Sequence, residues 1–361
     1  MFKRRDFLKW SGATLSASFT SGYPKSGTAS PPPARQAPKR LPPGLVFSAE
    51  CKQHLTGRGH PESPRRLDAI SAALAPERLG IELLRLKLRR ATREEILACH
   101  TGLYYELVER EAAAGGPMLS TGDTVISRRS FEIALLAAGG ALVAVDAVVE
   151  GRAGGVFCAL RPPGHHARPA QGMGFCVFNN AAIAARYAQR KHKLDRILIV
   201  DWDVHHGNGI QDIFYEDGSV FYFSTHQWPL YPGTGLEHET GKGAGAGTTL
   251  NCPFPAGSGP EEIVGAFREK LVPAADRFRP DLVIISAGFD SRIGDPLGRF
   301  RLRDRDFAEL TRIMMEIARR HARGRLISVL EGGYGLDGLA KAAAAHVLAM
   351  NVRSSRPDCT A

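Results

Sequence analysis

The chain has 361 residues, of which 43% are hydrophobic and 23% charged, and this is enough for one large globular domain or two medium ones. No run approaches 18 consecutive apolar residues, which argues against a membrane-spanning helix. The formal net charge is +10, but +7 of it falls in residues 1–40, and no basic stripe with interleaved aromatic residues follows, so nucleic-acid binding is set aside.

The first segment has the pattern of an export signal. Within residues 1–20, Arg4-Arg5 precede Phe7-Leu8 and a mildly apolar stretch, which is typical of a twin-arginine signal. The alternative is a basic N-terminus without that role. Residues 21–44 are rich in Pro, Ser, Gly and Lys and are predicted to be a linker. A twin-arginine signal would place the protein in the periplasm or outside the cell, and without one we expect the cytoplasm.

From residue 45 onward, strands and helices alternate. Short apolar runs predict strands at 45–47, 156–160, 197–200, 220–225, 282–286 and 326–330. Helical patterns cover 65–76, 93–114, 130–150, 180–193, 261–278, 304–322 and 338–351. This alternation predicts a mainly parallel sheet with helices on both faces, in one domain over 45–352 followed by a tail over 353–361.

Residues that can bind a metal follow two of these strands. Asp203 and His205 occupy alternate positions of an extended segment, so their side chains point the same way, and Asp290 follows the strand at 282–286. Because the carboxyl ends of parallel strands meet at one edge of a sheet, we expect the three to converge. Two carboxylates and one imidazole leave coordination open for water and substrate, and without a thiolate they fit Zn²⁺ or Fe²⁺.

Two further loops supply acid–base groups. His165 and His166 end a Pro-Pro-Gly segment, and paired imidazoles near an activated water can act as general base and acid. Asp201 and Asn208 flank the predicted metal strand and can orient these rings. Tyr334 follows two glycines and can donate its hydroxyl to a developing oxyanion. Each motif alone also fits a purely structural role, but their shared position past strand ends predicts hydrolysis of a carbonyl compound by activated water.

With these motifs in order, residues 45–350 resemble the histone deacetylase family, specifically its class II-like bacterial amidohydrolase branch. The motifs are Arg161–Ala167, Met173–Asn180, Asp201–Gly209, Tyr231–Gly235, Ser286–Asp290 with Gly294–Gly298, and Glu331–Tyr334. The resemblance implies the arginase/deacetylase fold, a single α/β domain with a central, mostly parallel eight-stranded sheet flanked by helices. It also implies a zinc-dependent amidohydrolase that removes acetyl or other acyl groups from lysine side chains.

The resemblance also implies roles for individual residues. It assigns zinc to Asp203, His205 and Asp290. It pairs His165 with Asp201 and His166 with Asn208, favours His166 as general base and acid, and lets Tyr334 polarise the acyl carbonyl. For substrate binding it implies Gly174, Phe175, Tyr231 and Leu297 around an acyl-lysine channel, with Asp123 holding the substrate backbone. It further implies structural K⁺ at the side chains of Asp201 and Ser224 and the main-chain oxygens of Asp203, His205 and Thr225, with an outer site at carbonyls near Phe214, Asp217 and Val220.

Two other functions stay open: hydrolysis of acetylpolyamines or other small amides, and binding of acyl groups without turnover. Polyamine-selective relatives with an acidic gatekeeper carry it where Leu297 stands, so Leu297 favours a neutral acyl-lysine stem. Arginase-like enzymes need a second Asp-x-Asp group, whereas the next acid after Asp290 is Asp295, so one catalytic metal is predicted. The expected partner is an acylated lysine peptide or a small acylated amine, and the sequence indicates no oligomeric state.

Overall fold

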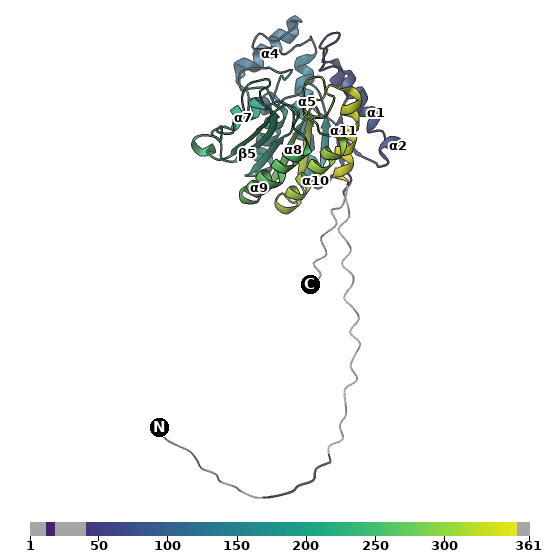
Figure 1. Cartoon of the computed structure of the whole chain (residues 1–361), viewed down its shortest axis with the longest axis vertical. Coiled ribbons are helices and arrows are strands. Elements are labelled where there is room, and N and C mark those ends of the chain that lie inside the picture. The colour runs from purple at the N-terminus through teal and green to yellow at the C-terminus, as the bar shows by residue number, and fades with distance from the viewer. Residues whose placement is uncertain (1–11, 19–40, 352–361) are drawn as a thin grey trace. The chain divides into compact units, whose positions relative to one another are not determined.

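The computed structural model describes residues 12–18 and 41–351 (Figure 1). The arginine pair of the predicted export signal, almost all of the predicted linker and the tail over 353–361 lie outside the described residues. Residues from Arg40 onward form one compact unit, and every predicted site residue belongs to it.

The core of this unit is a single sheet of eight strands in the order β2-β1-β3-β8-β7-β4-β5-β6, and every pairing is parallel. The strands are β1 (Gly44–Phe47), β2 (Leu84–Leu86), β3 (Val156–Ala159), β4 (Ile197–Asp201), β5 (Val220–Gln227), β6 (Thr249–Phe254), β7 (Leu282–Ala287) and β8 (Leu326–Leu330). Strands β3, β4, β7 and β8 are buried along their whole length, as expected of parallel strands covered on both faces. The predicted parallel sheet is therefore confirmed.

The apolar-run criterion missed the two edge strands. Strand β2 has only three residues, and β6 contains Asn251 and Pro253, which interrupt an apolar run. Both strands stand at the ends of the sheet, where a proline is tolerated because only one side of the strand is paired. Edge strands thus carry the weakest signal in the sequence.

Helices cover both faces of the sheet (Figure 1). They are α1 (Arg65–Ala73), α2 (Pro76–Leu79), α3 (Arg93–Ile96), α4 (Gly102–Ala114), α5 (Ser130–Val149), α6 (Asn180–His192), α7 (Asn208–Phe214), α8 (Pro260–Ala266), α9 (Val272–Phe278), α10 (Asp304–His321) and α11 (Leu336–Met350). Helices α10 and α11 pack against each other, α11 also packs against α1, and α10 against α8 and α9, whereas α5 packs against α4 and α6.

Two predicted helices differ from the structure. The segment 93–114 is divided into α3 and α4, because Thr101 caps a new helix by accepting a hydrogen bond from the Tyr104 amide. The segment 261–278 is helical throughout but contains a π-helical turn over Phe267–Leu271. Pro273 lies just after this turn, and a proline inside a helix removes one hydrogen bond and crowds the preceding turn.

Helix α5 is long and apolar enough to cross a membrane by length and composition, but 72% of its apolar window is buried inside the protein. The test of consecutive apolar residues did not flag α5, because Glu132 and Asp146 interrupt its sequence. A core helix of this kind passes the same composition test, so α5 is only weak evidence for a membrane span.

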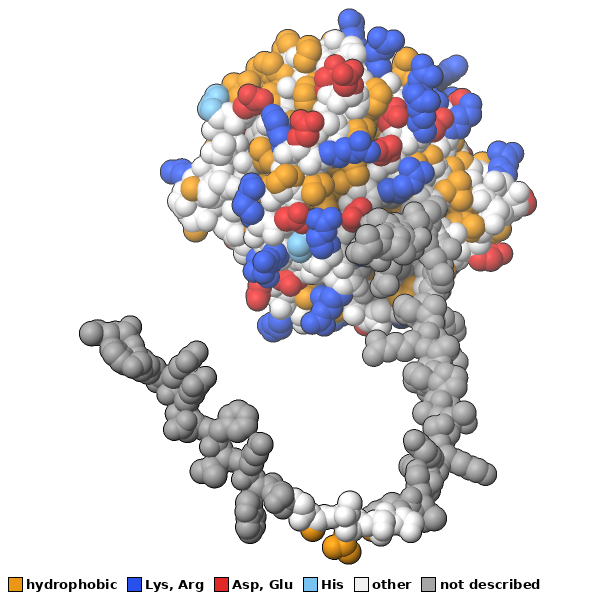
Figure 2. Space-filling view, turned by 60° about the horizontal axis from the view of Figure 1, so that its bottom comes forward, with side chains coloured by type: hydrophobic (Ala, Val, Ile, Leu, Met, Phe, Trp, Pro, Cys, Tyr) orange, Lys and Arg blue, Asp and Glu red, His pale blue; other side chains and the backbone are white. Residues whose placement is uncertain are grey.

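The surface carries charges of both signs. On the face in Figure 2, Lys and Arg side chains are interspersed with Asp and Glu. Over the described part of the chain, several of these are exposed ion pairs, such as Arg320–Asp276 at 2.8 Å and Arg93–Glu106 at 2.8 Å. Exposed pairs of this kind contribute little to stability, so the fold depends on the buried sheet and helices.

Candidate active site

Three carboxylate and imidazole groups converge beyond the carboxyl ends of β4 and β7. One ligand atom each of Asp203, His205 and Asp290 lies within 4.8 Å of the others, and all three residues are buried. His205 Nδ1 is 2.9 Å from Asp203 Oδ1 and 3.2 Å from Asp290 Oδ2. The parallel register brings them together, because Asp201 on β4 is paired with Ser286 on β7. The structure thus places the three predicted metal ligands in one cluster.

The environment of this cluster suits a bound cation. Asp290 Oδ2 is buried and has no hydrogen-bond partner, which is costly for a carboxylate unless a cation neutralises it. A Cβ at Gly332 would lie 2.0 Å from the same oxygen and 2.6 Å from Asp203 Oδ2, so only glycine fits over the cluster. Burial, followed by the charge of Asp203, raises the pKa of Asp290 to about 7. These donors match the preferences of Zn²⁺ and related divalent ions.

The tandem histidines lie beside this cluster and have different partners. His165 Nδ1 is 3.0 Å from Asp201 Oδ2, whereas His166 Nδ1 is 2.8 Å from Asn208 Oδ1. Burial alone would lower the pKa of His165, but the carboxylates of Asp201 and Asp203 raise it to about 10. Burial, and then the charges of His165 and His205, lower the pKa of His166 well below its usual range. One ring therefore carries a proton at neutral pH and the other is free to accept one.

A pocket of about 260 Å³ leads from the surface to this cluster. It is lined by Asp123, His166, Gly174, Phe175, His205, Leu230, Tyr231, Leu297 and Tyr334, which include every residue predicted to bind substrate. Gly174 has φ +55°, and a Cβ there would lie 2.2 Å from His166 Cδ2. Phe175 also adopts a positive φ of 67°. The backbone beside His166 therefore has a conformation that residues other than glycine rarely adopt.

Hydrogen bonds and ring contacts connect the residues that line the pocket. Asp123 Oδ1 accepts from the Gly174 amide at 2.7 Å, and the Tyr231 hydroxyl is 3.5 Å from the same oxygen. The Tyr231 ring meets that of His166 edge-to-face at 5.2 Å. Phe175 contacts the ring of Tyr334 at 5.9 Å. Aromatic rings from three loops therefore line the pocket.

Sequence reasoning missed a buried charge cluster behind Tyr334. The Glu62 carboxylate pairs with Arg161 and with Arg66 Nη1 at 3.1 Å, and all three side chains are fully buried. Arg66 Nε donates to the Gly333 carbonyl at 2.7 Å, and its guanidinium lies 5.0 Å from the centre of the Tyr334 ring. Arg66 thus fixes the loop that carries Tyr334. The one available sequence signal was the helical spacing of Glu62 and Arg66, which lets the two charges pair. Buried charges need such partners.

Two other acids missing from the prediction hold the catalytic loops. Glu331 Oε2 accepts from the amides of Gly164 and His165 at 2.7 and 3.0 Å. Asp295 Oδ2 accepts from the amides of Tyr334 and Gly335 at 2.7 and 3.0 Å, and its Oδ1 accepts from the Leu297 amide at 3.0 Å. Both side chains bind main-chain groups of neighbouring loops, which no sequence pattern reveals.

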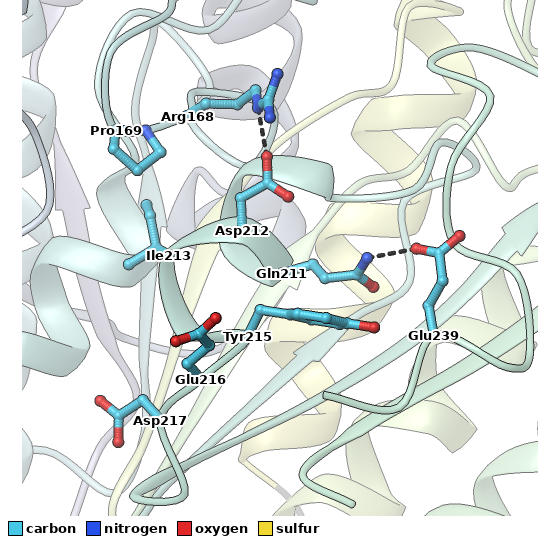
Figure 3. A pocket seen from close by; sticks show the side chains of 9 residues that line it. All are labelled: Arg168, Pro169, Gln211, Asp212, Ile213, Tyr215, Glu216, Asp217 and Glu239. Atoms are coloured by element: carbon cyan, nitrogen blue, oxygen red, sulfur yellow. Dashed lines mark hydrogen bonds and ion pairs between the residues drawn. The ribbon is translucent and has the colours of Figure 1, made fainter. Parts of the chain in front are cut away.

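A larger hollow of about 780 Å³ lies along α7 (Figure 3). Its charged residues pair with one another or with nearby groups: Arg168 contacts Asp212, and Gln211 Nε2 donates to Glu239 Oε2 at 2.5 Å. It contains neither of the two groups of metal-binding geometry found among the described residues. Size alone therefore does not mark a reaction site, and the smaller apolar pocket beside the Asp–His–Asp cluster is the better candidate.

The fold and this site together define a class of α/β hydrolases that act on amide bonds. Residues 60–350 match the histone deacetylase domain, so the chain belongs to the histone deacetylase family. The crystal structure of the HDA15 HD domain superposes with a TM-score of 0.81 at 35% identity, covering 86% of this chain and 90% of that one. This agreement is consistent with the arginase/deacetylase fold, and the chain is a deacetylase of the hydrolase class.

Relatives from several organisms carry related names. A "Probable deacetylase" of Archaeoglobus fulgidus is 41% identical and covers 82% of both chains. The "Histone deacetylase-like amidohydrolase" of Pseudomonas aeruginosa is 39% identical over 76% of this chain and 73% of its own. The "Polyamine deacetylase HDAC10" of Homo sapiens is 43% identical over 78% of this chain but 43% of its own. Family membership, with archaeal and bacterial relatives of this kind, is thereby confirmed.

Proposed function

We propose that the protein is a zinc-dependent deacylase that removes acetyl or other acyl groups from lysine side chains. The observation that carries this proposal is the convergence of Asp203, His205 and Asp290, of which His205 lines an apolar pocket together with His166 and Tyr334. An apolar channel suits the neutral methylene stem of an acylated lysine, and the polar groups at its end suit the amide.

Asp203, His205 and Asp290 would hold the metal, and the buried Asp290 Oδ2, which makes no hydrogen bond, supports a cation there. When bound, Zn²⁺ lowers the pKa of water and polarises a carbonyl, and Fe²⁺ is the alternative that these ligand types allow. Glycines at 288 and 332 would let the backbone close over the carboxylates, since a Cβ at Gly288 would lie 2.1 Å from Asp203 Oδ2.

His166 is the proposed general base and acid. Asn208 Oδ1 can only accept a hydrogen bond, so the His166 Nδ1 2.8 Å away donates, and Nε2 is left free to take a proton from the attacking water. His165 holds a proton shared with Asp201 and provides positive charge beside the reacting centre. His166 would then return its proton to the departing amine, which completes the hydrolysis without net change in either ring.

Tyr334 is the proposed oxyanion donor. Tyr334 lines the pocket, Asp295 accepts from its amide, and Arg66 donates to the carbonyl of the preceding Gly333. A preorganised donor of this kind stabilises charge that develops on the acyl oxygen. Phe175, Tyr231 and Leu297 would enclose the lysine stem, and Asp123 at the rim would bind N–H groups of the substrate backbone.

A structural K⁺ is proposed beneath the metal strand. Asp201 and Ser224 are cross-strand partners on β4 and β5, so both side chains can share one ion with the main-chain oxygens of Asp203, His205 and Thr225. Carbonyls near Phe214, Asp217 and Val220 would form the outer site. Adding K⁺ to protein freed of monovalent cations should raise the melting temperature, and an Asp201→Asn variant should lose that effect.

A second candidate substrate is an acylated polyamine. Asp123 is the one carboxylate among the residues lining the pocket, and at the rim it can bind a distal ammonium group instead of a peptide N–H. The human relative described as a polyamine deacetylase supports this alternative. The apolar Leu297 in the pocket favours the lysine substrate.

The deciding assay offers acetyl-lysine peptides and acetylated polyamines to the full-length protein after metal removal and reloading with Zn²⁺. Faster turnover of peptides, lost on adding a hydroxamate chelator, is the expected result. Turnover of polyamines alone would replace the proposed substrate, and no turnover of either by zinc-loaded protein would favour acyl binding without catalysis.

Export through the twin-arginine pathway is proposed from the sequence of residues 1–20. Fused to a reporter that acts only in the periplasm, the wild-type leader should give signal, and replacing Arg4 and Arg5 by Lys should remove it. Equal signal from both leaders would mean export by a route that does not need the arginine pair. No signal from the wild-type leader would leave the protein in the cytoplasm. Either result would overturn the proposal.

A further inference from the structure

A second cluster of metal-binding geometry lies behind the tandem histidines. One ligand atom each of His165, Cys176 and Glu331 lies within 4.8 Å of the others. The exposed fractions are 3% for His165 and 0% for both Cys176 and Glu331. His165 and Cys176 lie in the long loop between β3 and α6, and Glu331 follows β8, so the fold converges two loops here as it does at the first cluster.

The donor set differs chemically from the first one. It offers one sulfur, one nitrogen and one carboxylate oxygen, a combination that soft or borderline cations such as Zn²⁺ and Cd²⁺ prefer. Tetrahedral ligands at about 2.0–2.3 Å from an ion lie about 3.3–3.8 Å apart, so the donors need to close by about 1 Å. Glu331 accepts from the amides of Gly164 and His165 and from the Ser286 hydroxyl and keeps unused lone pairs. The Cys176 thiol contacts the Gly174 carbonyl at 3.4 Å and the main chain of His166.

The surroundings favour an added positive charge. His165 Nε2 is 3.9 Å from Asp203 Oδ2, and its Nδ1 is bonded to Asp201. Burial, followed by the charge of Glu331, raises the pKa of Cys176 well above its usual range, and burial raises the pKa of Glu331 to about 7. Protons thus partly neutralise this group of buried acids, and a divalent cation can replace them.

We propose that His165, Cys176 and Glu331 form a second metal site, separate from Asp203, His205 and Asp290, which inhibits the enzyme when a soft divalent cation fills it. Binding forms bonds to sulfur, nitrogen and oxygen and releases the Cys176 thiol proton and the His165 proton to solvent. The inhibition rests on the proposed function, because an ion on His165 removes the proton that assists the reaction. The site itself does not depend on that function.

Cadmium titration tests the site directly. Cys359→Ser is introduced into every protein so that the C-terminal tail, outside the described residues, contributes no thiol. Thiolate bound to Cd²⁺ absorbs in the ultraviolet, and the Asp203–His205–Asp290 set contains no sulfur, so the band reports only a cysteine site. We expect a band that saturates with one thiolate per chain, is lost in Cys176→Ser and persists in Cys158→Ser, a matched control for another fully buried cysteine.

A second variant tests the site even if Cys176→Ser fails to fold. Glu331→Gln retains an oxygen that can accept the two amides, and it should weaken Cd²⁺ binding at least about tenfold without removing the thiolate band at saturation. Absence of a band in the parent protein, or a band that Cys158→Ser removes and Cys176→Ser does not, would overturn the site.

The inhibition is measured separately, as the ratio of activities with and without excess Zn²⁺ in zinc-loaded enzyme. We expect Cys176→Ser to need at least about tenfold more Zn²⁺ for half inhibition than the parent. A cadmium band together with equal sensitivity of both proteins would keep the site and refute its inhibitory role. If the protein proved inactive on every substrate, the band would still test the site, so the two failures are distinguishable.

Discussion

At the scale of a single residue, removing the hydroxyl of Tyr334 tests the proposed chemistry. Its loss leaves the ring contact with Phe175 and the cation–π contact with Arg66 in place. We expect Tyr334→Phe to lower kcat by about 10²–10³, the usual cost of losing one oxyanion donor. Steady-state kinetics and metal analysis measure this, and the metal content should not change.

Tyr215→Phe is the matched control, because Tyr215 lines the hollow in Figure 3 and not the substrate pocket. It should retain the parental kcat. Full activity of Tyr334→Phe would show that another group stabilises the oxyanion.

The partner of His166 sets the pH range of the reaction. Asn208 is neutral, so the pKa of His166 is kept low by burial and by the positive charges around it. Asn208→Asp would place a carboxylate about 2.8 Å from Nδ1 and favour the imidazolium form. Since the base must be neutral to accept a proton, the acid limb of the kcat/KM profile should move to higher pH by about one unit or more. An unchanged acid limb would mean that His166 does not titrate in the reaction.

At the scale of elements, Asp295 connects two loops that form the pocket. Its carboxylate accepts the Tyr334, Gly335 and Leu297 amides, and Tyr334 and Leu297 both line the substrate pocket. Asp295→Ala leaves these amides without their acceptor, and we expect kcat to fall by about tenfold to a hundredfold as Tyr334 loses its position. Asp295→Asn retains one acceptor oxygen and should lose less.

A double-mutant cycle separates positioning from general damage. If Asp295 acts through the Tyr334 hydroxyl, Asp295→Ala should lower kcat much less in the Tyr334→Phe background than in the parent. Equal losses in both backgrounds would mean that Asp295 supports the fold and not the tyrosine. Melting temperatures of the four proteins, measured in parallel, show whether stability changes alongside.

The loops that these variants probe also show how far the sequence could predict the structure. Central strands were predictable because each apolar run ends in a polar loop with glycine, as at His165 and Asp290, and parallel topology then brings such loops together. The supporting groups were not predictable. Arg66 lies on α1 far along the chain from Gly333, and only the folded topology shows that it binds that carbonyl. Likewise, Asp295 and Glu331 bind main-chain amides, which have no sequence signature.

For the molecule as a whole, several buried histidines link folding to pH. Burial lowers the pKa of His54 and His100 to about 4 and that of His346 to about 3. The hydrogen bonds of His100 illustrate why a buried ring stays neutral. Its Nε2 accepts from the Asn179 amide at 2.9 Å, and its Nδ1 lies 3.0 Å from the Arg168 carbonyl. The bond at Nε2 requires the neutral ring, because a proton on Nε2 would face another N–H.

Protonation of these three histidines therefore opposes folding in acid, whereas Asp290 and Glu331, whose pKa values are raised to about 7, act in the opposite direction. Below about pH 6.5 the unfolded chain binds protons at these three histidines, while the folded protein excludes them until pH approaches about 4. Each of the three histidines should thus lower the free energy of unfolding by about 1.4 kcal/mol per pH unit as the pH decreases through that window. Urea unfolding from pH 7 to pH 4.5 measures the slope.

His100→Gln retains one donor and one acceptor but cannot be protonated, so its slope should be shallower by about 1.4 kcal/mol per pH unit. Because pH-dependent metal release affects both proteins alike, it cancels in the difference, and identical slopes would show that His100 is not kept neutral by the fold.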